Sequence, residues 1–207
     1  MKIIAILSQK GGTGKTTLAI NLGVTAAKSL SCAVTLIDLD PQASAASWSD
    51  GRAAAFPVVI SAQTHQLTHC LEEARRTGTR LVLIDTAPHS ENTALAAARA
   101  ADLVLIPCRP AILDLRAIGH TIDLVKLAGT PGMVVLNAIP PCGTLADEAA
   151  EAVAGYGVPL AAVRLTHRSA FIHSLTLGKS IQEYEPHGKG ANEIQCLFDW
   201  IQSFADI

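Results

Sequence analysis

The sequence predicts an α/β fold: a doubly wound, mostly parallel sheet with helices on both faces. Short runs of continuous apolar residues alternate along the chain with longer segments whose apolar residues recur at helical spacing. Continuous apolar runs are typical of parallel strands that are buried on both faces. No linker, repeat or low-complexity tract divides the 207 residues, so we expect a single domain over 1–207.

The first strand and the first helix enclose a glycine-rich loop. The apolar run Ile3 to Leu7 is followed by SQKGGTGKTT and then by the helical pattern LAINLGVTAAKSL. Glycines at such a junction let backbone N–H groups converge on an anion, and the helix N-terminus adds partial positive charge. We therefore predict a phosphate-binding loop in which Lys15 reaches the β- and γ-phosphates and the Thr16 hydroxyl binds Mg²⁺. The predicted nucleotide-binding residues of this loop are Gly11, Gly12, Thr13, Gly14, Lys15, Thr16 and Thr17.

The loop departs from the common pattern G-x-x-x-x-G-K-[ST]. Gln9 stands where that pattern has its first glycine, and a second lysine, Lys10, precedes Lys15 by five residues. Two lysines in one short loop indicate that two positive charges meet one triphosphate. Because Lys10 comes before the glycine turn, we expect it to point away from its own nucleotide and toward that of a partner.

The second predicted strand, 33–37, leads into Asp38-Leu39-Asp40-Pro41-Gln42. Alternate residues of an extended chain share a face, so we expect Asp38 and Asp40 side by side before Pro41 ends the ladder. Two adjacent carboxylates repel each other unless a cation or a positioned water uses them. A polar end to the strand is the alternative.

A later predicted strand runs from Arg80 through the apolar residues 81–84 to Asp85, in the manner of a Walker B strand. An aspartate at the carboxyl end of a buried parallel strand lies in the crevice that holds the phosphates. There it can hold Mg²⁺ through water. The alternative is a structural N-cap for the following helix.

The remaining elements continue the alternation of strands and helices. A loop or short helix is expected over 43–50, with Trp48 as a packing anchor. Further strands are expected at 57–60, 103–106, 133–136 and 160–163, and helices at 63–76, 91–101, 111–128, 144–154, 169–175 and 190–204.

The motif KGGTGKTT after an N-terminal strand, with D-x-D-P-Q and Asp85 in order behind it, resembles the ParA/MinD superfamily of ATPases. The small ParA-type, ParF-like partition proteins are the most similar group. The resemblance implies Mg²⁺-dependent ATP hydrolysis in an ATP-sandwich homodimer. The residues it implies are Lys10, Lys15 and Asp40 for catalysis, and Thr16, Asp38 and Asp85 for the metal, with Asp85 acting through water.

Later motifs also match the family. Asn137 resembles an adenine contact and Pro110 a neighbouring wall, although a simple turn role for Asn137 is equally open. The stretch from Gly178 to Glu183 resembles the family's late G-x-x-[IV]-x-E element. The phosphate loop begins at Lys10, so we expect no N-terminal helix-turn-helix domain.

Function within the superfamily rests on weaker signals. The resemblance to partition proteins implies that the ATP-bound dimer binds nonspecific DNA. It also implies that a ParB-type centromere-binding protein stimulates the weak ATPase activity of the dimer. The segment 155–190 holds four basic residues and two acidic ones, although an ordinary solvated surface explains this excess nearly as well. The formal net charge of -2 means that any DNA contact must come from such a local patch. The candidate DNA contacts are Arg164, Arg168 and Lys179.

Two further hypotheses come from other classes. A MinD-like or cargo-positioning ATPase would act at a membrane or a protein partner, but the tail ANEIQCLFDWIQSFADI has no Lys or Arg to attract anionic lipid. An iron–sulfur reductase needs two exposed cysteines per chain in glycine-rich loops, and only Cys142 is a near candidate. Scattered cysteines and the lack of a long apolar run favour a cytoplasmic protein with mostly buried thiols and no membrane contact. The resemblance to partition proteins implies that it associates with the nucleoid.

Overall fold

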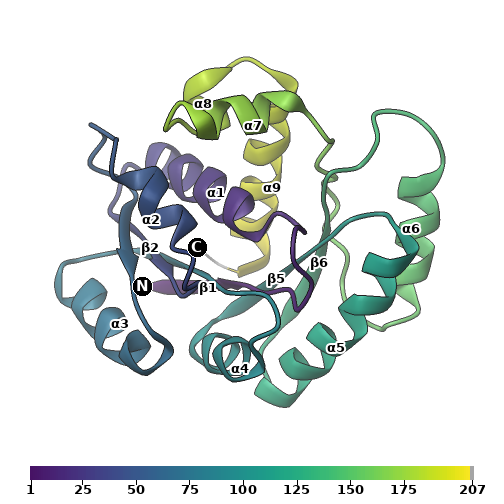
Figure 1. Ribbon diagram of the computed structural model, residues 1–207, viewed down its shortest axis with the longest axis horizontal. Helices are drawn as coiled ribbons and strands as arrows, with labels where there is room; N and C mark the ends of the chain where they lie inside the picture. The colour runs from purple at the N-terminus through teal and green to yellow at the C-terminus, as the bar shows by residue number, and fades with distance from the viewer. Residues whose placement is uncertain (206–207) are drawn as a thin grey trace.

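The computed structural model describes residues 1–205 and shows one sheet between two layers of helices (Figure 1). Its strand order is β3-β2-β4-β1-β5-β6, and every pair of neighbouring strands is parallel. The doubly wound parallel fold expected from the alternating pattern is thus confirmed. The strands are β1 (Lys2–Ile6), β2 (Val34–Asp38), β3 (Val58–Ser61), β4 (Leu81–Asp85), β5 (Leu103–Cys108) and β6 (Gly132–Leu136).

The helices divide between the two faces of the sheet, and each face has its own buried apolar cluster (Figure 1). One face is covered by α3 (Leu67–Arg76), α4 (Glu91–Ala100), α5 (Ile112–Ala128) and α6 (Leu145–Ala154). The other is covered by α1 (Lys15–Leu30), α2 (Ser44–Ser49), α7 (Ser169–Thr176), α8 (Ile181–Tyr184) and α9 (Lys189–Ala205).

Helical periodicity correctly marks the buried faces. The helix expected over 111–128 has an apolar stripe at helical spacing, which comprises Leu115, Ile118, Ile122 and Val125, and this stripe is buried. Trp48 on α2 is 8% exposed, which confirms it as a packing anchor. The apolar face of α9 packs with α1 in the same core cluster, as expected of a helix that closes the domain.

Two expected elements differ in the structure. The helix expected over 63–76 is divided into a 3-10 turn, η1 (Thr64–Gln66), and α3. The strand expected over 160–163 is only an isolated bridge between Leu160 and Val134. Val134 of β6 donates to the carbonyl oxygen of Pro159 and accepts the Ala161 N–H, but the next N–H to bond β6 is that of Leu165 and not that of Val163, so the ladder stops after Ala161.

Two findings bear on the expected location of the protein. Within residues 1–205 no helix is both long enough and apolar enough to cross a lipid bilayer. All five cysteines are free, but Cys142 and Cys196 are exposed and Cys32 is half-buried. The expectation of mostly buried thiols is therefore wrong, because only Cys70 and Cys108 lie in the core.

Candidate nucleotide-binding site

The glycine-rich loop lies between the carboxyl end of β1 and the start of α1. Gly12 and Gly14 have φ angles of 74° and 91°, a backbone conformation that residues other than glycine rarely adopt. A Cβ on Gly14 would also lie 2.3 Å from Nδ2 of Asn137. Position 14 therefore requires glycine for two separate reasons, its backbone conformation and the close approach of Asn137.

The N-terminus of α1 is open to an anion. Its N-cap is Gly14, no side chain caps it, and its first turn holds no acidic residue. The first N–H groups of the helix thus meet no side-chain acceptor, and the helix dipole favours negative charge there.

Lys15 stands in this first turn and is buried, with 6% exposed. Its Nζ donates to the carbonyl oxygen of Lys10 at 3.4 Å. Burial lowers the pKa of Lys15, while the nearby carboxylates of Asp85 and Asp40 act in the opposite direction. A desolvated ammonium with acidic neighbours and an open helix N-terminus is suited to neutralising a bound phosphate.

The structure brings Thr16 and Asp85 together from separate elements. The Thr16 hydroxyl donates to Oδ2 of Asp85 at 2.6 Å, while the buried Oδ1 of Asp85 has no partner within residues 1–205. Burial raises the pKa of Asp85 to about 7, against the opposing effect of the Thr16 hydrogen bond, and the charge of Asp38 raises it further. An unsatisfied carboxylate oxygen beside a hydroxyl fits a magnesium ion, which prefers oxygen ligands.

Asp38 lies beside Asp85, because the two residues are register partners on β2 and β4. Its Oδ1 accepts the N–H of Asp40 at 3.0 Å, and its Oδ2 accepts those of Ala45 and Ala46 at 2.9 and 3.3 Å. Both oxygens thus hold the turn after β2 and the start of α2. Burial raises the pKa of Asp38, and these backbone hydrogen bonds reduce the rise.

Asp40 lies beyond the end of β2, in the turn that follows it, and its charge acts on Asp38 as expected of neighbouring carboxylates. β2 ends at Asp38, whose carboxylate accepts the Asp40 N–H and turns the chain before Pro41. The Asp40 carboxylate accepts the Gln42 N–H at 2.9 Å and acts electrostatically on both Lys15 and Asp85. Asp40 therefore faces the phosphate site from the turn and not from the sheet.

Lys10 makes an ion pair within its own chain. Its Nζ lies 2.7 Å from Oδ2 of Asp114, in the first turn of α5. The Asp114 side chain is 9% exposed and that of Lys10 is 34% exposed. The expected outward orientation of Lys10 is thus not the one in this single chain, and sequence reasoning missed Asp114 because no short-range spacing connects the two.

A cavity of about 150 Å³ adjoins the loop and is lined by Gly14, Thr17, Asn137 and Arg109 among others. The Asn137 side chain donates to the carbonyl oxygen of Thr13 at 2.7 Å, so it holds the loop as well as facing the cavity. Pro110 is buried and lies outside the lining, whereas its neighbour Arg109 lies within it. Arg109, which the sequence analysis did not single out, therefore lines the cavity in place of Pro110.

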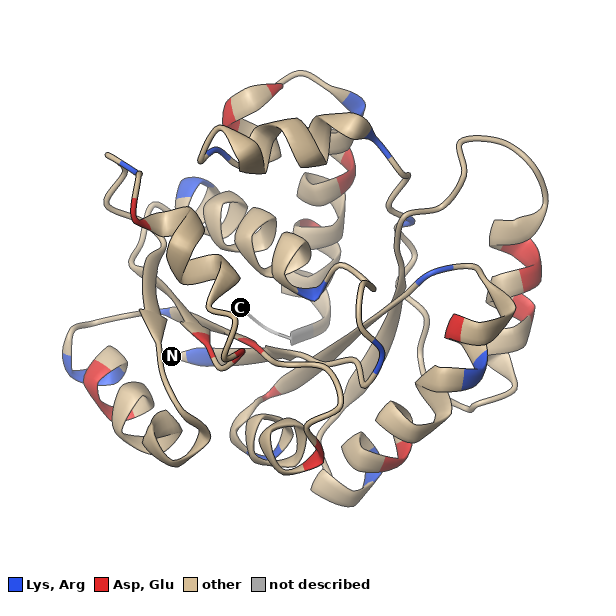
Figure 2. Ribbon diagram, viewed as in Figure 1, with Lys and Arg blue, Asp and Glu red and all other residues tan. Residues whose placement is uncertain are grey.

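Two of the three basic residues expected at DNA have acidic partners in the fold. Arg164 pairs with Asp147 at 2.7 Å, and Arg168 pairs with Glu193 at 2.5 Å. Asp147 and Glu193 both lie outside the segment 155–190, whose excess of basic residues predicted a DNA-binding patch. Acidic residues from other parts of the fold therefore neutralise two of its four basic residues. Lys179 is exposed. In Figure 2 the charged positions are scattered over several elements, with acidic residues alone on α6 and basic residues alone on α1.

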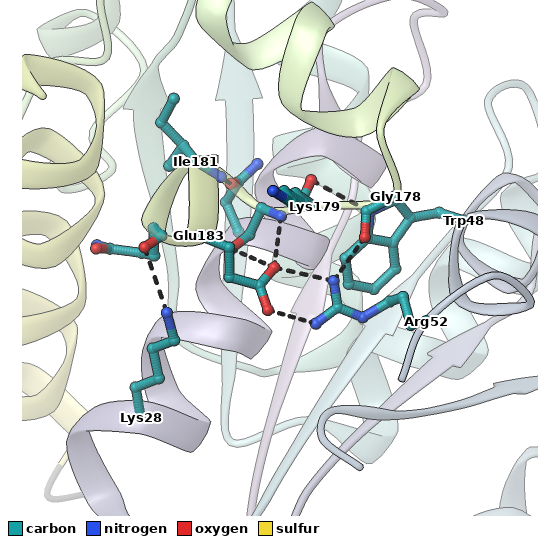
Figure 3. Close-up of polar contacts among 10 residues, drawn as sticks. Lys28, Trp48, Arg52, Gly178, Lys179, Ile181 and Glu183 are labelled. Atoms are coloured by element: carbon teal, nitrogen blue, oxygen red, sulfur yellow. Dashed lines mark hydrogen bonds and ion pairs between the residues drawn. The ribbon is translucent and has the colours of Figure 1, made fainter. Parts of the chain in front are cut away.

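The late motif at 178–183 has a structural role. Glu183 accepts two hydrogen bonds from Arg52, at 2.7 and 2.9 Å, and the guanidinium lies over the ring of Trp48 at 4.1 Å (Figure 3). Arg52 and Trp48 also donate to the carbonyl oxygens of Gly178 and Lys179. The motif therefore fastens α8 to the end of α2, the helix whose start is held by Asp38.

We expect Glu183→Gln to lower the free energy of unfolding by about 2–4 kcal/mol at pH 7, because it leaves the Arg52 guanidinium buried without its counter-charge. Burial alone would raise the pKa of Glu183, but hydrogen bonds from Arg52 and Ser180 lower it to about 2 from 4.5. The carboxylate therefore stabilises the fold above pH 4.5, and this contribution disappears as the pH falls toward 2.

Urea unfolding of wild type and Glu183→Gln at several pH values measures this difference. The gap between the two proteins should narrow steadily below pH 4.5. Glu185→Gln is the matched control, since Glu185 is exposed. A gap that stays constant with pH would contradict the assignment.

The comparisons with known proteins agree with this geometry. A family model described as "CobQ/CobB/MinD/ParA nucleotide binding domain" matches residues 4–57. The maintenance of carboxysome distribution protein A of Gloeobacter kilaueensis is 34% identical over 198 residues, which cover 94% of this chain and 89% of that protein. The chain belongs to the ParA/MinD superfamily. It is thus a ParA/MinD-type ATPase by family, as the loop motif indicated.

Other superfamily members match over nearly their whole lengths. The chromosome-partitioning ATPase Soj of Thermus thermophilus is 27% identical over 237 residues, which cover 97% of this chain and 95% of that protein. The septum site-determining protein MinD of Pyrococcus horikoshii, solved with Mg-ADP, superposes with a TM-score of 0.78 at 21% identity and covers 99% and 97% of the two chains. At this identity the structural match shows the shared fold.

Proposed function

We propose that the protein is a Mg²⁺-dependent ATPase whose ATP-bound dimer positions a large cargo over nonspecific DNA. The hydrogen bond between Thr16 and Asp85 is the main support for this proposal, because these two oxygen-bearing side chains lie beside an open helix N-terminus and a buried lysine. The names of two relatives also support it, one from carboxysome distribution and one from chromosome partitioning.

Each residue of the site has a role in this proposal. Lys15 and the first N–H groups of α1 neutralise the phosphates, and Thr16 and Asp85 hold the magnesium ion, Asp85 through water. The ion supplies further charge neutralisation at the phosphates. Asp40 orients the attacking water, and its place in the turn after β2, where its charge acts on Lys15, supports this role.

Completion of the site by a second subunit is part of the proposal. Lys10 brings its charge to the nucleotide of the partner subunit, as an arginine finger does. In the single chain Lys10 is bound to Asp114. Unstimulated hydrolysis is therefore slow, and a partner protein accelerates it.

Two versions of this function differ in the cargo that the ATPase positions. In the first version the cargo is a plasmid or chromosome, attached through a ParB-type centromere-binding protein. In the second it is a protein body. A membrane role has less support, because Leu197, Phe198 and Ile201 of α9 are at most 1% exposed and cannot enter a bilayer without leaving the core.

Binding to a random-sequence DNA duplex tests the proposal, measured with Mg-ATP and with Mg-ADP at 50 and 200 mM salt. We expect binding with Mg-ATP only, and a loss of affinity at the higher salt because counterion release drives nonspecific binding. Lys179→Ala should weaken binding, and Lys126→Ala on α5 serves as the control. DNA binding that is independent of nucleotide and salt, or pelleting with anionic liposomes, would contradict this version of the function.

A further inference from the structure

Arg109 lies over the glycine-rich loop. It directly follows β5, the strand that pairs with β1, and β1 leads into the loop. Its Nη2 lies 3.9 Å from the position that a Cβ on Gly12 would occupy. The same side chain lines the cavity together with Gly14 and Thr17. Arg109 thus reaches both glycines whose left-handed conformations shape the anion site.

The Arg109 side chain is exposed, and it has no hydrogen bond or ion pair with any residue of the described part of the chain. This distinguishes it from Arg52, Arg164 and Arg168, each of which is held by a carboxylate. A guanidinium without an acidic partner, beside the left-handed glycines of the loop and the uncapped N-terminus of α1, is available to a phosphate oxygen. Its planar donors suit phosphate, which arginine binds through two parallel hydrogen bonds.

The geometry points to Arg109 as a further phosphate-binding residue, which closes over the phosphates of a bound nucleoside di- or triphosphate from the side opposite Lys15. This role rests on the proposed ATP binding and adds a residue to it. Lys15 contacts the phosphates from within the first turn of α1, where it is buried. Arg109 contacts them from the solvent side, where its guanidinium replaces water that would otherwise cover the mouth of the loop.

Binding measurements with and without a base separate a phosphate contact from a base contact. Mg-ADP and magnesium tripolyphosphate are titrated calorimetrically into wild type, Arg109→Ala and Arg109→Lys. We expect Arg109→Ala to weaken both ligands by at least about tenfold, because a hydrogen-bonded charge pair is lost. Arg109→Lys should recover part of the loss, since lysine keeps the charge but not the paired donors.

Arg116→Ala is the matched control. Arg116 is also exposed, it stands on the adjoining helix α5, and its removal changes the net charge by the same amount. It should bind both ligands as wild type does. Thermal unfolding without ligand should be unchanged in both variants, because neither arginine has a partner within residues 1–205.

The outcomes distinguish the inference from the proposed function. Equal affinities of wild type and Arg109→Ala for both ligands would overturn the inference and leave ATP binding intact. A loss for Mg-ADP alone would also overturn it, because it would place Arg109 at the base or the ribose. If wild type binds neither ligand, the proposed function itself fails.

Discussion

Lys15→Ala is expected to reduce ATP hydrolysis by about 10²–10³-fold and to weaken Mg-ATP binding strongly. Removal of a single charge-stabilising group from a preorganised site has an effect of this size. The side chain is 6% exposed and lies in the first turn of α1, where no other side chain caps the helix. Its loss leaves the phosphates with the backbone N–H groups alone, and also removes the ammonium group that interacts electrostatically with Asp85 and Asp40.

Steady-state phosphate release and calorimetric titration of Mg-ATP measure this effect. The fold should survive, because burial already disfavours the charged form of Lys15, so alanine removes a desolvated group. Lys126→Ala, on the exposed side of α5, is the control and should hydrolyse ATP normally. If Lys15→Ala hydrolyses ATP within tenfold of wild type, the assignment of this loop as the catalytic phosphate site is wrong.

Lys10→Ala is expected to keep ATP binding but to lose ATP-dependent dimerisation, and with it about 10²–10³-fold in hydrolysis. The reason is that a charge contributed in trans acts only in the dimer, as an arginine finger does. Sedimentation velocity with and without Mg-ATP measures the dimer, and calorimetry measures nucleotide binding by the same variant. A Lys10→Ala protein that dimerises normally with Mg-ATP would contradict the trans role.

Asp114→Asn separates the two functions that Lys10 could have. If the ion pair between Lys10 and Asp114 is itself what the dimer needs, both substitutions should impair dimerisation. If the pair holds Lys10 back in the single chain, Asp114→Asn should promote dimerisation while Lys10→Ala abolishes it. We expect the second result, because the 2.7 Å contact must open before Lys10 can reach a second subunit. The gain should be modest, about fivefold, since Lys10 is partly exposed to solvent.

Most of the fold could be predicted because its determinants are local. Strands buried on both faces appear as continuous apolar runs, as 103–108 does, and amphipathic helices appear as stripes, as on α5. Two expectations that the structure does not match also have physical explanations. The expected strand at 160–163 has the right composition, but its ladder with β6 stops after Ala161, because the next N–H to bond β6 is that of Leu165. Asp40 lies in a turn and not on the strand, because the Asp38 carboxylate accepts its N–H and turns the chain within two residues.

The candidate site divides in the same way. Gly14, Lys15 and Thr16 could be assigned from sequence because one strand, one turn and one helix start place them without help from the rest of the chain. The proximity of Asp38 and Asp85 could also be anticipated, since the carboxyl ends of neighbouring parallel strands meet at one edge. No such rule places Arg109 over Gly12, because that contact depends on how a loop leaves β5.

The sequence by itself determined the fold class, the phosphate loop and the membership of the superfamily, because each is written in contiguous residues whose local structure is nearly autonomous. Only the tertiary structure decided which charges are free. Lys10 is bound by a residue 104 positions away, and Arg168 by one 25 positions away. Coulomb energy depends on distance in space and on burial, so a count of charges along the chain cannot show which of them the fold has already neutralised.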